Sequence, residues 1–584
     1  MKYTLAHVTH EAVEKLGGIG TVLEGLITSP VYQERVGRSI LVGPCQTHVA
    51  VDPSKRLGEE GTVLYSSADQ IDELGVGPKL RPIEWAFNAP IVYGRRTFET
   101  PDGARRGEAD VLMIDVFNIS QDRLGRFKYR LAETFDIDSA RYDQAWDYDE
   151  YVRLAEPAFY ALVALLGEEE LPCVLLSHEF MGMATGLKCV LDGPDMFRTV
   201  FHAHECATAR HLVEHHAGHD TMFYNALGLA REQGKYVEDV FGDLSHLFRH
   251  ALISKSHCCD AIMAVGDYTA EEMHFLGRHF DHHRIELVYN GVPAEPVTLD
   301  QRNAGRAMLI DYTEAILGYR PDVLMTHITR PVISKGMWRD LQVCDDLDKR
   351  FAQDGRKGVL YILTSGGGTR NPRDVRSMEQ EYGWPADHRA GYPDLVGPEV
   401  DLWRMIEPFN ADHDHVKVVL ANQFGWSADR IGRRVPEGMT IADLRNAADV
   451  EFGMATYEPF GISPLEPLGS GAVCVISNVC GCGGFVEQVV DGKPCDNVLV
   501  ADYTRLDRPM GLDEVVNMTA AQRDAVERAE SARVAEELLR RVPGDDDARR
   551  KLLVEGQRLV QQMGWDQVVE SGLAPVLERI TNGR

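Results

Sequence analysis

Short apolar runs alternate with helical patterns along most of the chain, and this alternation limits the possible folds more than any other feature. The first series begins at Tyr3 to Val8 and continues through the runs SILVGP, DVLMIDVF, CVLLSHEF, RTVFHAHE, AIMAVGD and IELVYNG. Gly, Asn or Asp bounds these runs. Such a pattern is typical of parallel strands that helices cover on both faces. We therefore predict an α/β fold.

The alternation restarts after the polar stretch 293–306, with the runs DVLMTHITR, GVLYILTSG, HVKVVLAN, DVEFGMATY, AVCVISNV and NVLVADY. A chain of 584 residues also exceeds what one hydrophobic core usually supports. We expect one domain over 1–295, a second over 296–545 and C-terminal helices over 546–584. The Gly- and Pro-rich segment 366–413 is expected to be an irregular or partly helical insertion.

The net charge of −29 argues against a nucleic-acid partner, because binding to phosphate backbones needs clustered Lys and Arg. No stretch approaches the roughly 20 apolar residues of a membrane span, and the first residues do not read as a signal peptide. We therefore expect a cytoplasmic protein that does not bind membranes. The eleven cysteines lie mostly in apolar runs, which suits reduced thiols, and the C-x-C pair Cys480 and Cys482 has no second pair to complete a zinc site.

A glycine cluster follows the first predicted strand, in the segment EKLGGIGTVLEGL (residues 14–26). It lacks the third glycine of a dinucleotide-binding loop and the lysine pattern of a P-loop. Gly17, Gly18 and Gly20, with Lys15 beside them and a helix expected to begin near Thr21, nevertheless outline an anion site. A tight turn that packs the first helix on the first strand explains the same residues equally well.

In open parallel sheets, ligands bind at the carboxyl ends of the strands, so the residues that follow each run deserve comparison. Two such residues in the second half are basic: Arg330 leaves a strand, and Lys335 stands at a glycine-bearing helix start. Taken singly, each reads as a surface charge, but together they could neutralise a diphosphate. The corresponding residues in the first half are His178, Glu179, His204, Arg210 and Asn290.

The segment YEPFGISPLEPLGSG contains two glutamates, Glu458 and Glu466, in an E-x7-E spacing. Ser463, Pro464 and Glu466 have the pattern of a helix N-cap, N1 and N3, which predicts a capping box. Glu466 can also accept hydrogen bonds from a ribose. Glu458 lies before the cap and has no capping role, so it is the better candidate for a catalytic carboxylate.

The segment HLVEH, residues 211–215, matches the H-x-x-E-H pattern of some zinc hydrolases, and His219 extends the same helical face. The chain has 21 histidines, so a chance match is the simpler interpretation. The zinc-hydrolase alternative would require stoichiometric metal in the purified protein.

Several of these segments occur together in one order: KLGGIGTV, SHEF, HAHECATARHL, FYNALG, VYNGV, TRPVISKG and YEPFGISPLEPLGSGAVCVISNVCGCGGF. This combination resembles the glycogen and starch synthases, most closely the animal and fungal type, glycosyltransferase family 3. The resemblance extends from Tyr3 to about Val490.

The resemblance implies a GT-B fold, in which two Rossmann-like domains face each other across a cleft. The first domain would lie on the acceptor side, the second would bind the nucleotide sugar, and the last helix would cross back to the first domain. Glucose would pass from UDP-glucose or ADP-glucose to the 4-hydroxyl of an α-1,4-glucan such as glycogen. The anomeric configuration would be retained, no metal or other cofactor would be needed, and a homo-oligomer would be compatible with the family.

The resemblance also assigns roles to residues. The catalytic set would be Glu458, Arg330, Lys335 and His204; the donor-binding set Lys15, Gly17, Gly18, Gly20, Asn290, Tyr457, Gly461, Ile462, Ser463 and Glu466; and the acceptor or sugar side His178, Glu179 and Arg210. The sequence departs from the family at Pro467, which is expected to distort the helix start. It also lacks the arginine-dense helix that binds glucose 6-phosphate. A transferase acting on a small sugar and a catalytically silent glucan-binding protein remain as alternatives.

Overall fold

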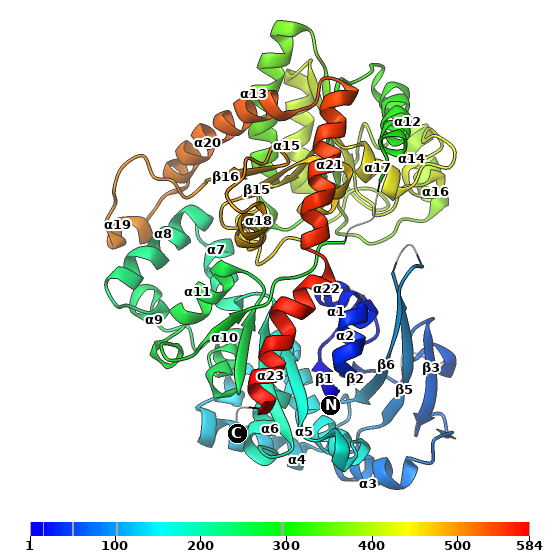
Figure 1. Ribbon diagram of the computed structural model, residues 1–584, viewed down its shortest axis with the longest axis vertical. Helices are drawn as coiled ribbons and strands as arrows, with labels where there is room; N and C mark the ends of the chain where they lie inside the picture. Colours follow the sequence, from blue (N-terminus) through cyan, green and yellow to red (C-terminus); the bar gives the residue numbers. More distant parts are fainter. Residues whose placement is uncertain (1, 16, 49–51, 101–102, 294–296, 583–584) are drawn as a thin grey trace. The chain divides into compact units, whose positions relative to one another are not determined.

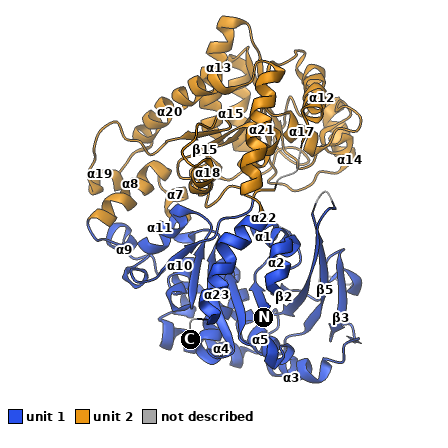
Figure 2. Cartoon of the chain, viewed as in Figure 1, with its two compact units in different colours: residues 1–209, 233–291, 565–584 blue, residues 210–232, 292–564 orange. Residues whose placement is uncertain are grey.

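The computed structural model describes residues 2–15, 17–48, 52–100, 103–293 and 297–582. The chain forms two compact units, which Figure 2 colours separately. The first unit comprises residues 1–209, 233–291 and 565–584, and the second comprises residues 210–232 and 292–564. The expected domain boundary between 295 and 296 lies outside the described residues.

The sheet of the first unit has ten strands in the part of the chain that the structure describes. In their order across the sheet they are β10 (Ile285–Leu287), β9 (Ala261–Ala264), β8 (Phe197–Ala203), β7 (Cys173–His178), β1 (Tyr3–Val8), β2 (Val36–Cys45), β6 (Arg106–Asp115), β5 (Ile91–Glu99), β3 (Gly61–Ser66) and β4 (Ile71–Asp72). Strands β10 to β6 in this order are parallel, as expected, and all their apolar runs were identified in the sequence.

The strands β5, β3 and β4 are antiparallel and were not expected. The amide of Thr100 donates to the carbonyl of Arg105 at 3.0 Å, and only the six residues 100–105 separate β5 from β6 in the sequence. A parallel connection would need a crossover of a dozen or more residues, so a connection of this length requires the antiparallel direction. An antiparallel extension thus continues the predicted parallel sheet.

Helices cover the parallel part of this sheet because its strands are apolar on both faces. Helix α6 packs against β7 and β8, and its neighbour α5 packs against β2 and β6 (Figure 1). The helices of the first unit are α1 (Gly18–Thr28), α2 (Pro30–Arg35), α3 (Gly77–Phe87), α4 (Gln121–Phe135), α5 (Trp146–Leu165), α6 (Glu179–Asp192), α9 (Val237–Phe241), α10 (Phe248–Ile253), α11 (Asp267–Phe275), α22 (Trp565–Val568) and α23 (Ala574–Asn582). Helix α7 (Ala207–His215) spans the division between the units.

The sheet of the second unit is parallel throughout its described strands, as the sequence predicted. Its strands, in order across the sheet, are β13 (Val416–Ala421), β12 (Gly358–Leu363), β11 (Val323–Ile328), β14 (Val450–Gly453), β15 (Val473–Ser477) and β16 (Val498–Ala501). Both faces are buried: Leu360 and Ile362 of β12 belong to one apolar core, and Val359 and Tyr361 belong to the other. This alternation follows from the two-residue period of a strand.

The helices of the second unit are α8 (His219–Glu232), α12 (Leu299–Leu317), α13 (Met337–Asp354), α14 (Pro372–Tyr382), α15 (Pro398–Asp412), α16 (Ala428–Ile431), α17 (Ile441–Ala447), α18 (Cys482–Val490), α19 (Leu512–Val516), α20 (Ala520–Arg541) and α21 (Asp546–Gln562). Helices α14 and α15 lie in the segment 366–413, which is therefore partly helical, as expected. No helix among the described residues is long and apolar enough to cross a membrane.

The segment 210–232 belongs to the second unit although it lies within the expected first domain. A buried ion cluster explains this placement. The guanidinium of Arg339 donates to both carboxylate oxygens of Asp220, at 2.6 and 3.0 Å, and to Glu527 at 2.9 Å, and all three side chains are fully buried. Thr221 and Asn225 add hydrogen bonds to the chain at 503–504.

The chain returns to the first unit at Trp565, later than the expected boundary at 546. A Cβ atom on Gly25 would lie 2.1 Å from the Trp565 ring, and one on Gly291 would lie 2.5 Å from it. The indole therefore occupies space that only glycine leaves free. Helix α21 stays in the second unit, where it packs against the segment 463–470.

We predict that Arg339→Met lowers the free energy of unfolding of the second unit by about 3–5 kcal/mol, because it leaves two buried carboxylates without their cation. The exposed pair of Arg350 and Glu536 also joins α13 to α20, so Arg350→Met is a matched control that should change stability by less than about 1 kcal/mol. Hydrogen exchange of α13 and α20 peptides in a urea series measures the change in unfolding free energy for both variants. Equal effects of the two variants would contradict the assignment of Arg339 as the buried hub.

Candidate functional site

Each sheet has a point at which the chain changes direction across the sheet. In the second unit this point lies between β11 and β14, because β12 and β13 follow on one side and β15 and β16 on the other. In the first unit it lies between β1 and β7. Ligands of open α/β sheets bind in the crevice outside the carboxyl ends of strands at such switch points.

Hydrogen bonds and close packing hold together the two loops at the switch point of the second unit. The amides of Thr456 and Tyr457 both donate to the carbonyl of Ser334, at 2.8 and 3.2 Å. Gly336 has φ 62°, and a Cβ atom there would lie 2.5 Å from the carbonyl oxygen of Met454. Only glycine tolerates this combination of conformation and contact. The loop after β11 is therefore fixed against the loop after β14.

These loops bring two of the predicted site residues into direct contact. The Lys335 Nζ forms an ion pair with the Glu458 Oε2, and the two side chains are 13% and 15% exposed. A partly buried pair of this kind holds the two side chains in a fixed orientation. The sequence predicted that each of these residues follows a strand, but it did not predict that the two strands are neighbours or that the two side chains form a pair.

Arg330 leaves the same strand as Lys335, and its side chain is exposed. Its guanidinium has no hydrogen bond or ion pair within the parts of the chain that the structure describes. The switch point of the second unit therefore presents one paired cation and one cation available to an anionic ligand.

The loop that carries Glu458 is shaped by glycine and cysteine neighbours. The amide of Gly481 donates to the carbonyl of Glu458 at 2.9 Å. Gly461 has φ 90°, and a Cβ atom there would lie 2.8 Å from the sulfur of Cys480. Cys480 and Cys482 are buried, and their sulfur atoms are 3.3 Å apart.

The predicted capping box at Ser463 is wrong. Residues Ser463–Ser470 form a 3-10 helix with Ile462 at the N-cap. The Ser463 hydroxyl donates instead to the carbonyl of Ile328 at 2.9 Å. Glu466 pairs with Arg445 of α17, and Pro467 removes an amide from the first turns, as expected for a distorted helix start.

Two further residues of the predicted set meet in the second unit. The guanidinium of Arg210 lies over the ring of Tyr457, with its Cζ atom 5.6 Å from the ring centroid. Tyr457 is buried, so this cation–π contact fixes the position of Arg210 beside the loop of Glu458.

At the switch point of the first unit, the glycine cluster begins helix α1 at Gly18, three residues earlier than expected. The amides of Gly17 and Gly20 donate to the Glu11 carboxylate at 2.8 and 2.9 Å. A carboxylate at a helix N-terminus is favourable, since it meets unpaired amides and the positive end of the helix dipole. The Lys15 Nζ lies 3.3 Å from the Glu24 carboxylate. The cluster therefore does bind an anionic group, and in this structure that group belongs to the chain itself.

A chain of histidines occupies the same region of the first unit. His7 lies in β1, and its Nδ1 is 2.9 Å from the Nε2 of His178 at the end of β7. The Nδ1 of His178 is in turn 2.8 Å from the Nε2 of His204. Burial lowers the pKa of His7 to about 3, and burial together with the neighbouring rings holds the pKa values of His178 and His204 well below their usual range. These imidazoles are neutral at pH 7.

Glu179 and Asn290 are both buried in the first unit. Glu179 begins α6 with φ 58°, and its Oε1 accepts a hydrogen bond of 2.6 Å from the amide of Glu205. A positive φ at a glutamate is uncommon and is held here by the surrounding structure. The predicted acceptor-side residues His178 and Glu179 thus lie next to each other where β7 ends and α6 begins.

The zinc-hydrolase pattern does not gather three ligands in the described residues. His211 and His215 stack with ring centroids 4.2 Å apart, but the Nδ1 of His219 lies 2.8 Å from the carbonyl of Val213. The third histidine of the expected face, His219, therefore bonds to a backbone carbonyl instead of joining the other two at a shared ligand position.

Three residues that complete these clusters were missed in the sequence. Glu11 caps the glycine loop, Arg445 pairs with Glu466, and His202 lies among the other histidines. Glu11 could have been found, because it lies three residues after the strand that precedes the glycines. His202 could also have been found, since it alternates with His204 in the run HAHE. No comparable pattern in the sequence indicated that Arg445 belongs to the site.

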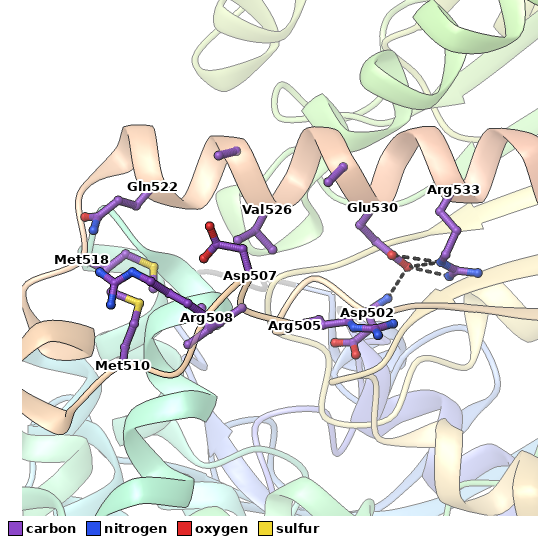
Figure 3. A pocket seen from close by; sticks show the side chains of 13 residues that line it. Asp502, Arg505, Asp507, Arg508, Met510, Met518, Gln522, Val526, Glu530 and Arg533 are labelled. Atoms are coloured by element: carbon purple, nitrogen blue, oxygen red, sulfur yellow. Dashed lines mark hydrogen bonds and ion pairs between the residues drawn. The ribbon is translucent and has the colours of Figure 1, made fainter.

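A separate cavity of about 420 Å³ lies in the second unit beside α20 (Figure 3). Its charged lining comprises Asp502, Arg505, Asp507, Arg508, Glu530 and Arg533, three acids and three arginines. Arg533 is paired with Glu530, which also accepts a hydrogen bond from the amide of Asp502. The lining is thus close to electrically neutral, and none of the predicted catalytic residues contributes to it.

No protein-family model and no curated protein sequence matches this chain. Solved structures do match it. The catalytic domain of Arabidopsis thaliana starch synthase IV, bound to ADP and acarbose, is 14% identical, with a TM-score of 0.52 over 100% of this chain and 99% of that chain. The E. coli trehalose-6-phosphate synthase bound with UDP-2-fluoro glucose is 11% identical, with a TM-score of 0.51 over 98% of both chains.

A trehalose-6-phosphate synthase studied for glycosyl transfer with retention is 12% identical, with a TM-score of 0.50 over 98% of this chain and 99% of that chain. The narrower resemblance to glycosyltransferase family 3 stays a prediction. What these structures have in common with the chain is a fold built from two Rossmann-like units, and the chain has the GT-B fold.

Proposed function

We propose that the chain is a retaining glucosyltransferase that elongates an α-1,4-glucan from a nucleoside diphosphate glucose. The observation that carries the proposal is the pairing of Lys335 with Glu458 at the switch point of the second unit, where Arg330 follows the same strand as Lys335 and has no ion-pair partner among the described residues. The fold supports it, since GT-B structures of sugar transferases match over nearly the whole chain.

The charges at this switch point suit the departure of a nucleoside diphosphate. Arg330 and Lys335 would neutralise the leaving diphosphate, so that no metal or other cofactor is needed. Movement of the Lys335 side chain from Glu458 toward the phosphate would leave a free Glu458 carboxylate next to the transferred glucose. A negative charge there would stabilise the positive charge that develops on the sugar ring.

The acceptor distinguishes this proposal from the alternative of a GT-B transferase that acts on a small sugar. Among the similar structures, one is a starch synthase bound to acarbose and others are trehalose-6-phosphate synthases, so the fold is compatible with both a glucan and a small acceptor. The sequence segments that resemble the glycogen and starch synthases favour the glucan. His178, Glu179 and Arg210 would lie on the acceptor or sugar side.

We expect the purified chain to transfer labelled glucose from UDP-glucose or ADP-glucose to glycogen in buffer that contains EDTA. Each donor is offered separately with glycogen, with glucose 6-phosphate and with no acceptor, and products are separated by size. Transfer only to glucose 6-phosphate would show that the acceptor is a small sugar and not a glucan. Absence of transfer and of donor hydrolysis in every mixture would contradict the proposal and favour a silent binding protein.

We predict that Glu458→Gln lowers the turnover number by ~100-fold or more while the donor affinity stays nearly unchanged, since the variant keeps the shape and removes the charge. Initial rates and donor binding by calorimetry measure the two quantities. Glu407→Gln is the matched control, because Glu407 is an exposed glutamate of the same unit. Wild-type turnover in Glu458→Gln would show that another group is the catalytic carboxylate.

We also predict that glucose 6-phosphate changes the rate by less than about twofold, because four of the five arginines of α20 are already paired with acids. Arg523 lies 2.7 Å from Asp524, Arg533 lies 2.5 Å from Glu530, and Arg540 lies 2.5 Å from Glu537. A titration at subsaturating donor concentration measures the effect. A many-fold rise in rate would show that an effector site exists despite these pairs.

A further inference from the structure

We propose that His178, His202 and His204 form a binding site for one divalent transition-metal ion of the zinc type. The proposal concerns binding alone and does not depend on the glucosyl transfer proposed above. It rests on three observations in the first unit: the convergence of three imidazoles, the lack of hydrogen-bond partners for one of them, and a series of hydrogen bonds that orients another.

The three rings converge closely enough for one ion. One nitrogen from each of His178, His202 and His204 lies within 4.8 Å of the other two. The ring centroids of His202 and His204 are 4.1 Å apart, and that of His178 lies 5.1–5.3 Å from both. Zinc–nitrogen bonds of about 2.0–2.1 Å in a tetrahedron place the ligand nitrogens about 3.3 Å apart. Small side-chain rotations bring the three nitrogens to this spacing.

His202 provides the observation that points to a ligand. It is 3% exposed, and neither of its ring nitrogens has a hydrogen-bond partner in the described part of the chain. A buried polar side chain without a partner is costly, and one imidazole nitrogen always carries a lone pair. A metal ion bound at that lone pair would supply the missing partner.

Hydrogen bonds from the other side orient His178. Its Nε2 lies 2.9 Å from the Nδ1 of His7, the Nε2 of His7 lies 3.1 Å from the Tyr32 hydroxyl, and that hydroxyl lies 2.8 Å from the Ser39 hydroxyl. When His178 donates from Nε2, its Nδ1 carries a lone pair and faces the Nε2 of His204, 2.8 Å away. Histidine ligands of metals are commonly held in this way by a partner on the second nitrogen.

The chemistry of the three groups selects the class of ion. Imidazole nitrogen suits zinc, copper, nickel and cobalt, whereas magnesium and calcium prefer oxygen ligands. Burial lowers the pKa of His202 to about 3, so this ring, like the other two, is neutral at pH 7 and needs no deprotonation before it binds. Three protein ligands leave one coordination position open to water or to an added ligand.

The test uses the full chain, stripped with EDTA and desalted, and titrated with zinc chloride or cobalt chloride. We expect one ion per chain by calorimetry and a visible absorption spectrum of the cobalt form typical of four-coordinate nitrogen ligation. In a crystal grown with zinc, an anomalous difference peak should lie between the three rings. This peak locates the ion in the unmodified protein and does not depend on any variant. A peak elsewhere, or no bound ion, would overturn the proposal.

Two variants separate this site from the surface histidines. His202→Phe keeps an aromatic ring and breaks no hydrogen bond of the described structure, so it should fold, which a thermal melt checks. It should weaken zinc binding by ~100-fold or more, because even the loss of an outer partner of a ligand costs up to ~100-fold. The control His211→Phe/His215→Phe removes the stacked pair on α7 and should leave the affinity unchanged. Unchanged zinc affinity in His202→Phe together with weakened affinity in His211→Phe/His215→Phe would assign the ion to α7 and contradict the proposal.

Discussion

The guanidinium of Arg339 is the interaction on which the second unit depends most. It is fully buried, and besides the carboxylates of Asp220 and Glu527 it donates to the carbonyls of Met454 and Ala455, both at 3.3 Å. One side chain thus joins α13, α8 and α20 to the loop after β14. Because a buried charge without partners is strongly unfavourable, these elements are fixed together. Glu458 lies three residues beyond this anchored backbone, so the same cluster positions the candidate carboxylate.

The positions of the site residues follow from strand order rather than from any single motif. In each sheet, the two neighbouring strands at the switch point are followed in the chain by strands on opposite sides of the sheet, and the charged and titratable groups lie at or near their carboxyl ends. In the second unit these groups are Arg330, Lys335 and Glu458. In the first unit they are Glu11 and the histidines that begin with His7 and His178. Two topologically similar units therefore present different chemistry at the same place in the fold.

The sequence predicted the parallel strands well because Val-, Ile- and Leu-rich runs buried on both faces leave a strong local signal. It did not predict β5, β3 and β4, whose runs include polar and charged residues such as Arg95, Arg96 and Thr97. The ion pair of Lys335 with Glu458 spans 123 residues, so local patterns contain no information on it. The prediction of a capping box was wrong for a related reason, because the Ser463 hydroxyl donates to the carbonyl of Ile328, 135 residues away in the sequence.

The two predicted anion sites differ in what already occupies them. At the glycine cluster, Gly17 and Gly20 donate to Glu11, which is 3% exposed, so a phosphate there would have to displace a buried carboxylate. At the second switch point, Lys335 is paired with Glu458, and Arg330 is exposed and has no carboxylate partner among the described residues. Within the proposed function, the charge of the diphosphate would therefore be neutralised mainly by Arg330 and Lys335. Transfer of Lys335 from Glu458 to the phosphate would couple the departure of the diphosphate to the appearance of a free carboxylate next to the sugar.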